Sequence, residues 1–171
     1  MRTNIISDFR TATTEFVELL HSLSEKQLNS PTSGNDWTAG QIGDHILKSY
    51  NVMTILHGPI KPTSRDPYEK LPPIIEMFAD DTIKMEAPAE VVPESGYIHK
   101  EKLIKGLQER IAEQNEVLEN EDLRVLCTAF KLPGSEDYFT RLEWLGFNLV
   151  HTQRHIRQLK RTIETIKNPN Q

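Results

Sequence analysis

The sequence predicts an all-α protein, a four-helix bundle in which a long crossover joins the second helix to the third. Four stretches place apolar residues three and four positions apart, which is the spacing of one helix face. Two of these stretches open with a helix-capping pattern, and a proline-rich connection separates the middle two. Because the chain has 171 residues and no internal repeat, we expect one domain over residues 1–171.

The first two helices are predicted from an apolar stripe and from a capping box. The stripe of the first helix consists of Ile5, Phe9, Ala12, Phe16, Leu19 and Leu23. The second helix begins at Thr38, because the side chains of Thr38 and Gln41 can each accept a hydrogen bond from the other's free backbone N–H. Its stripe comprises Ile42, Ile46, Ser49, Met53 and Leu56. The run His57-Gly58-Pro59 predicts the end of this helix.

The third and fourth helices are predicted over residues 100–120 and from residue 140 onward. The third carries Leu103, Leu107, Ile111 and Leu118 on or near one face. The fourth opens with a second capping box, Thr140 with Glu143, and is expected to end at Asn168-Pro169. Its stripe keeps spacings of three and four throughout, as in a helix packed lengthwise on a bundle: Leu142, Leu145, Leu149, Thr152, Ile156, Leu159, Ile163 and Ile166.

The connection between the second and third helices contains most of the prolines. These are Pro59, Pro62, Pro67, Pro72, Pro73, Pro88 and Pro93. Proline interrupts helical hydrogen bonding, so this segment cannot be one continuous helix, although residues 74–78 could form a short one. A connection this long can run the length of a bundle and bring the next helix in parallel to the last. We therefore expect an up-down-down-up order of helices.

Composition and charge restrict the class of protein. Hydrophobic residues make up 37% and charged residues 26% of the chain, and no apolar run approaches the roughly 18 residues of a membrane span. The N-terminal residues lack a secretory pattern, and Cys127 is the sole cysteine, so a disulfide within the chain is impossible. We expect a cytoplasmic protein without a membrane partner, with Cys127 as a small buried apolar residue.

Nucleic-acid binding is the alternative that the basic last helix suggests. Its cations are Arg154, Arg157, Lys160, Arg161 and Lys167. They lie largely opposite the apolar stripe, where solvated charge is expected, and cations near a helix C-terminus also suit the helix dipole. The formal net charge of −5 and the absence of interleaved aromatic residues argue against a nucleic-acid partner.

A pair of histidines in the fourth helix suggests a metal site. His151 and His155 are four residues apart, so both imidazoles lie on one helix face and can point at one ion. The alternative is two partly exposed histidines beside the apolar stripe. A two-histidine site would need a third ligand, and His45 is the best candidate because it lies next to the stripe of the second helix. For His21, His57 and His99, solvated or capping roles are expected.

Two segments resemble the DinB superfamily, which includes the YfiT-like bacillithiol transferases. They are WTAGQIGDHI at residues 37–46 and TRLEWLGFNLVHTQRHIRQL at residues 140–159. The resemblance covers nearly the whole chain in the order of its elements. It implies a four-helix bundle and a divalent-metal site of three histidines, which carries over onto His45, His151 and His155. All three positions match.

Three histidine ligands leave a coordination position open, as in catalytic zinc sites. Such a position can activate water or a thiol as a nucleophile. The resemblance implies a small-molecule substrate and a low-molecular-weight thiol as cosubstrate, so we expect a thiol S-transferase or a hydrolase. Nickel and zinc are the favoured ions. The alternative function is a non-catalytic, metal-binding or dimerising stress-response protein. A homodimer through an exposed helix face suits bundles of this kind, although no residue specifies one.

Few other residues look catalytic. Asp44 is expected to face solvent, and Glu143 is explained by its capping role. Gln41, Trp144 and Asn148 are candidates for supporting the metal ligands or lining the pocket, but a helix-surface amide or ordinary aromatic packing explains them as well. Trp37 is a further candidate for the wall of the site.

Overall fold

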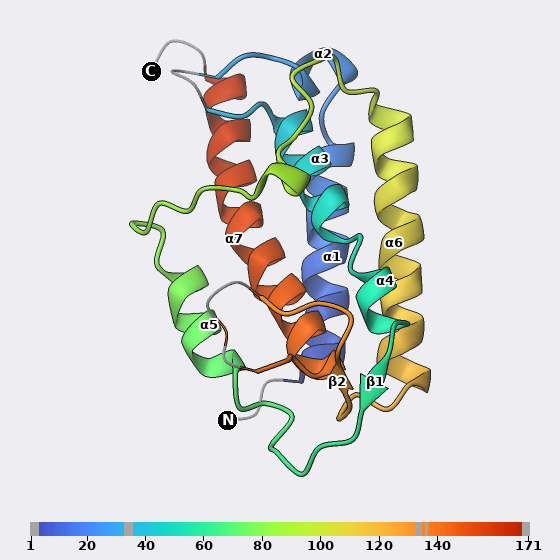
Figure 1. Ribbon diagram of the computed structural model, residues 1–171. Coiled ribbons are helices and arrows are strands. Elements are labelled where there is room, and N and C mark those ends of the chain that lie inside the picture. The colour runs from blue at the N-terminus through green and yellow to red at the C-terminus, as the bar shows by residue number, and fades with distance from the viewer. Residues whose placement is uncertain (1–3, 33–35, 133–134, 136, 169–171) are drawn as a thin grey trace.

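The computed structural model describes residues 4–32, 36–132, 135 and 137–168 (Figure 1). The helices of the bundle are α1 (Ile5–His21), α3 (Ala39–Ser49), α6 (Lys100–Asn120) and α7 (Arg141–Lys167). Helices α1 and α7 run in one direction and α3 and α6 in the other, so the predicted all-α class and the up-down-down-up order are confirmed (Figure 1). Pro169, part of the predicted end of the last helix, lies outside the described residues.

Shorter elements connect the bundle helices. The helical ones are α2 (Glu25–Leu28), α4 (Met53–Leu56), α5 (Leu71–Ala79) and the 3₁₀ turn η1 (Ala89–Val91). Strands β1 (Ile60–Lys61) and β2 (Leu126–Cys127) pair antiparallel, with Ile60 opposite Cys127. Cys127 is fully buried, which confirms that it belongs to the core.

Capping interactions fix the starts of α3 and α7 as the sequence predicts. The Thr38 hydroxyl accepts from the Gln41 backbone N–H, and the Gln41 side-chain oxygen accepts in return from Thr38 N–H. Thr140 and Glu143 form the same reciprocal pair at α7. Each pair satisfies backbone donors that would otherwise be orphaned at a helix start.

Helix α7 is the central packing element, because it contacts α1, α3, α5 and α6. The predicted stripes of α1 and α7 supply most of their core residues, and Phe9, Phe16, Leu145 and Leu159 are almost inaccessible to water. At the crossing of α5 and α7, a Cβ atom on Gly146 would lie 2.6 Å from a methyl group of Leu71, so a larger residue there would require the Leu71 side chain to shift.

The second predicted helix is interrupted, where the stripe had suggested a continuous one. Helix α3 ends at Ser49, and the Asn51 N–H bonds to the Lys48 carbonyl three residues back, which tightens the last turn. Tyr50 is completely buried at this point, and its hydroxyl lies 2.5 Å from the Thr152 hydroxyl on α7. Tertiary packing of Tyr50 thus accompanies the break, and α4 resumes after it.

Helix α5 is longer than the predicted residues 74–78. Pro72 and Pro73 lie in its first turn, where a missing N–H breaks no intrahelical hydrogen bond. The crossover, here residues 80–98, then leaves α5 and passes η1 on its way to the start of α6 (Figure 1).

The basic residues of α7 bind other parts of the chain. Arg154 donates to the carbonyls of Asp80 and Ile83, whereas Arg157 and Arg161 both bind the Asp81 carboxylate. The expected solvated face is therefore, at these positions, an attachment surface for the start of the crossover. No helix in the described part of the chain is both long and apolar enough to cross a membrane.

A buried ion pair joins the loop before α5 to the start of α7. Glu143 is fully buried, and its carboxylate accepts two hydrogen bonds from the Arg65 guanidinium, at 2.6 and 2.8 Å. It also accepts from the backbone N–H groups of Lys70 and Thr140. The sequence explained Glu143 by capping alone, so its role as the counter-charge of Arg65 is an addition.

We predict that Glu143→Gln lowers the free energy of unfolding by about 3–5 kcal/mol, because it leaves the Arg65 charge without its buried partner. The single oxygen of Gln can keep the capping bond to Thr140, but its NH2 group cannot accept from Lys70, so the substitution removes the charge and one acceptor together. The matched control is Glu15→Gln, which removes one partner of the exposed pair with Lys160 and should cost less than about 1 kcal/mol. Urea unfolding measures both, and equal losses would contradict the prediction.

Candidate metal centre

Three histidine side chains from two helices meet between α3 and α7. His45 comes from α3, and His151 and His155 come from consecutive turns of α7. The Nε2 atom of His151 lies 3.0 Å from Nε2 of His45 and 3.0 Å from Nε2 of His155. One ligand nitrogen from each residue lies within 4.8 Å of the others, and all three residues are buried. The fold therefore brings together the three histidines that the sequence selected.

The hydrogen bonds of the Nδ1 atoms determine the direction in which the His45 and His155 rings point their Nε2 lone pairs. His45 Nδ1 lies 2.7 Å from the Val91 carbonyl oxygen, and His155 Nδ1 lies 2.8 Å from the Gln158 side-chain oxygen. Since both oxygens can only accept, each Nδ1 must donate. The Nε2 atoms of His45 and His155 are then unprotonated in the neutral rings and direct their lone pairs inward.

His151 differs from the other two histidines. Its Nδ1 atom is buried and has no hydrogen-bond partner among the described residues. Its Nε2 atom is shared between the other two rings. A buried polar atom without a partner is uncommon and is often found at functional sites.

Burial keeps the three imidazoles neutral. Loss of hydration, with a smaller effect of the neighbouring histidines, lowers the pKa of His155 to about 3 and the pKa of His151 well below its usual range. Burial also lowers the pKa of His45, partly offset by its hydrogen bond to Val91. Neutral imidazole is the form that binds metals, so none of the rings has to lose a net proton at neutral pH. In the metal-free protein His151 Nε2 carries the N–H that faces the two lone pairs, so this ring would have to move its proton to Nδ1 before its Nε2 atom could bind an ion.

Aromatic side chains wall the cluster on two sides. The Trp37 ring lies with its centroid 4.9 Å from that of His45 and 6.5 Å from that of His155. Phe78 of α5 and Phe147 of α7 lie against His151, at 5.4 and 5.7 Å between centroids. These walls leave the cluster in apolar surroundings, which strengthens electrostatic interactions inside it.

The sequence proposed Gln41, Trp144 and Asn148 as supports of the metal ligands or as pocket lining, and in the structure these residues contact other parts of the chain. The Gln41 amide bonds to the Glu94 carbonyl, and the Asn148 amide bonds to Gln114 of α6 at 2.6 Å. Trp144 packs against Phe147, which in turn contacts His151, and the Trp144 Nε1 atom has no partner among the described residues. None of the three has a recorded hydrogen bond to His45, His151 or His155.

The expectation that Asp44 faces solvent is wrong. Its carboxylate lies 2.9 Å from the Lys48 ammonium and accepts a hydrogen bond from the Glu94 backbone N–H, so it is held against the crossover. The metal-ligating group formed by the described residues contains no carboxylate. His21, His57 and His99 are exposed and lie outside the group, as expected.

The direct contacts of the cluster include residues that the sequence did not single out. Phe147 and Gln158 are four residues before His151 and three after His155, so helical spacing could have identified them. Phe78 and the Val91 carbonyl come from the crossover region, where no periodic pattern connects them to the histidines.

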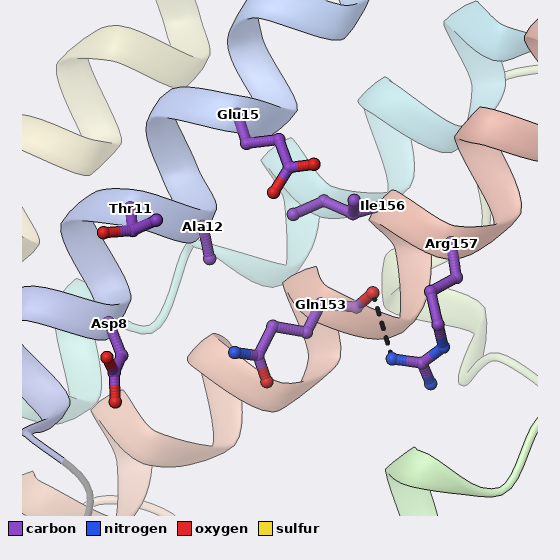
Figure 2. A pocket seen from close by; sticks show the side chains of 7 residues that line it. All are labelled: Asp8, Thr11, Ala12, Glu15, Gln153, Ile156 and Arg157. Carbon is purple, nitrogen blue, oxygen red and sulfur yellow. Dashed lines mark hydrogen bonds between the residues drawn. The ribbon is translucent and has the colours of Figure 1, made fainter.

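A separate groove of about 310 Å³ lies between α1 and α7. Figure 2 shows its lining residues, Asp8, Thr11, Ala12, Glu15, Gln153, Ile156 and Arg157. Gln153 and Arg157 are two residues beyond His151 and His155, so they point to nearly the opposite side of α7. The Arg157 guanidinium donates to the Gln153 carbonyl at 3.3 Å, as drawn in Figure 2. This groove is distinct from the histidine cluster.

The fold and the cluster define a helical-bundle protein with a candidate three-histidine metal centre. The profile of the DinB superfamily matches residues 8–159, so the chain belongs to the DinB superfamily. A curated relative is the uncharacterized protein YuaE of Bacillus subtilis (strain 168), which is 26% identical over 167 residues, 95% of this chain and 99% of that protein. No solved structure matches the chain at a significant level.

The neutral cluster predicts a pH-dependent stability in the absence of metal. The pKa of His155 is lower in the folded state than its ordinary value of about 6.5, so the unfolded state binds more protons below that pH. The contribution of His155 to the free energy of unfolding is fully present above about pH 6.5 and is lost as the pH falls toward about 3. A fully neutral buried histidine then contributes a slope of about 1.4 kcal/mol per pH unit.

We expect His155→Phe to reduce this slope by about 1 kcal/mol per pH unit between pH 6 and 5, because one such group is removed. Urea unfolding of chelator-treated protein at several pH values measures the slope. An unchanged slope in His155→Phe would show that His155 titrates equally in both states.

Proposed function

We propose that His45, His151 and His155 bind one divalent metal ion through their Nε2 atoms. The observation that carries this proposal is the convergence of three neutral, buried nitrogens with separations of 3.0 to 4.8 Å. A tetrahedral ion with bonds of about 2.0–2.1 Å holds its ligand nitrogens about 3.3 Å apart. The cluster therefore suits an ion after side-chain adjustments of a few tenths of an ångström to about 1.5 Å.

The donor set favours nickel or zinc. Imidazole nitrogen suits both ions, whereas magnesium and calcium prefer oxygen ligands, which this group lacks. The hydrogen bonds from His45 to Val91 and from His155 to Gln158 support the proposal, because ligating histidines ordinarily donate their second N–H to such acceptors.

We further propose that the protein is a metal-dependent enzyme, a thiol S-transferase or a hydrolase that acts on a small molecule. When bound, the ion would act as a Lewis acid that activates a thiol or water nucleophile. Trp37, Phe78 and Phe147 would exclude water and contact the apolar part of a substrate. The neutral histidines would hold the ion without cancelling its charge, which favours binding of an anionic nucleophile.

A non-catalytic metal-binding role is the second candidate. The specific observation that favours it is the burial of the cluster, since His45, His151 and His155 are only 4%, 8% and 8% exposed. In addition, the carboxylate nearest in sequence, Asp44, binds the crossover and Lys48. In this role the ion would stabilise the fold and turn over no substrate.

The metal site predicts stoichiometric binding of an ion that requires His151. In His151→Ala we expect at least a 10-fold loss of affinity, because two nitrogens remain, with helical content largely kept. Elemental analysis of protein purified without an affinity tag, with circular dichroism, measures both quantities. The control is His99→Ala, whose side chain is 72% exposed. Full occupancy in His151→Ala would contradict the site.

The enzymatic proposal predicts turnover that depends on the ion. We expect metal-loaded protein to react with a panel of low-molecular-weight thiols and electrophilic acceptors, or to hydrolyse an ester or amide from a second panel. His151→Ala should lose at least 100-fold in rate because the Lewis acid is absent. Stoichiometric metal binding without metal-dependent turnover in either panel would favour the non-catalytic role.

A further inference from the structure

Helix α3 holds the end of the crossover next to one of the proposed metal ligands. The Lys48 ammonium donates to the Val92 carbonyl at 2.9 Å, and the Asp44 carboxylate accepts from the Glu94 N–H at 2.9 Å. Lys48 and Asp44 also pair with each other at 2.9 Å. We call this arrangement the crossover clip, meaning Lys48 and Asp44 of α3 with the backbone of Val92 and Glu94.

The clip fixes the backbone group that orients His45. The Val91 carbonyl, which accepts from His45 Nδ1, directly precedes the residue that Lys48 binds. The turn around η1 adds the bonds from Val91 N–H to Pro88 and from Val92 N–H to Ala89, so Val91 and the N–H of Val92 belong to one hydrogen-bonded turn, which the Val92 carbonyl directly follows. Movement of Val92 away from α3 would therefore also move the acceptor of His45.

We infer that Lys48 is a positioning residue for the metal centre, acting through the crossover clip and the Val91 carbonyl on His45. The part of this inference that concerns metal affinity rests on the proposed function. The clip holds the His45 ring in the tautomer and orientation that direct Nε2 at His151 and His155. Lys48 touches none of the three nitrogens, and its effect passes through the crossover.

The charge of Lys48 and its positioning role predict opposite effects on metal affinity when Lys48 is replaced. An ammonium one turn from His45 repels a cation. Burial is the main cause of the lowered pKa of His45; the Asp44 carboxylate raises this pKa, and the Lys48 charge lowers it by a smaller amount. Removal of Lys48 would therefore tighten metal binding if charge alone mattered. Loss of the clip would weaken it, because groups that orient a ligating histidine typically account for 10–100-fold in affinity.

Thermodynamic linkage gives the inference a second measurable consequence. If the hydrogen bonds of the crossover clip raise the affinity for the ion, the bound ion must stabilise those hydrogen bonds by the same factor. The Glu94 amide, which donates to Asp44, reports on the clip. We expect its hydrogen exchange to slow when zinc is added to the wild-type chain.

The test compares Lys48→Met with Lys48→Arg and with Asp81→Asn in the full chain. Methionine keeps the apolar stem of Lys48 and loses the donor, whereas arginine can still donate to Val92. Asp81→Asn weakens the other end of the crossover, where Asp81 binds Arg157 and Arg161. With zinc as the probe, we expect affinity to fall about 10–100-fold in Lys48→Met and to change less than about threefold in the other two.

A metal-independent measurement accompanies the affinities. Long-range ¹H–¹⁵N spectra of ¹⁵N-histidine-labelled, metal-free protein identify the tautomer of His45. We expect the Nδ1–H form in the wild type and in Lys48→Arg, and a mixture in Lys48→Met. Circular dichroism and thermal unfolding confirm that each variant is folded.

The outcomes separate this inference from the proposed function. Wild-type binding of zinc with unchanged or tighter binding in Lys48→Met would overturn the positioning role and leave the metal site intact. An unchanged His45 tautomer in Lys48→Met would also overturn it. A wild-type chain that binds no ion would overturn the metal site, and the role of Lys48 with it.

Discussion

The structure depends on one electrostatic constraint, which is that three buried imidazoles lie together while the described residues add no carboxylate to the group. Charging any of them there is unfavourable, so the rings stay neutral. A neutral imidazole has one N–H and one lone pair, and a buried N–H needs an acceptor. Val91 and Gln158 accept from two of the rings, which turns the lone pairs of those rings toward His151.

Helix α7 can serve as the platform of the cluster because polar contacts fix it on each neighbour. Glu143 holds its first turn to Arg65, and the Asn148 amide binds Gln114 on α6. The Thr152 hydroxyl, adjacent to His151 in sequence, hydrogen-bonds with the hydroxyl of Tyr50, the residue directly after α3. The bond between Tyr50 and Thr152 ties the end of α3 to the residue next to His151.

Apolar spacing and Thr-x-x-Glu/Gln capping patterns predicted the bundle, because both depend on residues only three or four positions apart in the sequence. The same spacing selected His151 and His155, while His45 was selected by its place beside a stripe and by family resemblance. Phe78 lies on α5, and Val91, Val92 and Glu94 lie on the crossover, whose course depends on tertiary contacts. The sequence did not predict the helix break at Tyr50, because the break also accompanies a tertiary contact, the buried hydrogen bond of the Tyr50 hydroxyl with α7.

Two of the three candidate ligand residues lie on adjacent turns of one helix, but the third is 106 residues away from His151 in the sequence. Contacts of such separation cost more loop-closure entropy than contacts between adjacent turns of a helix. An isolated α7 can present only a pair of nitrogens, and the full set exists once α3 has docked. A ligand that needs all three nitrogens therefore recognises completed tertiary structure, and by mass action its binding would favour the folded over the unfolded chain.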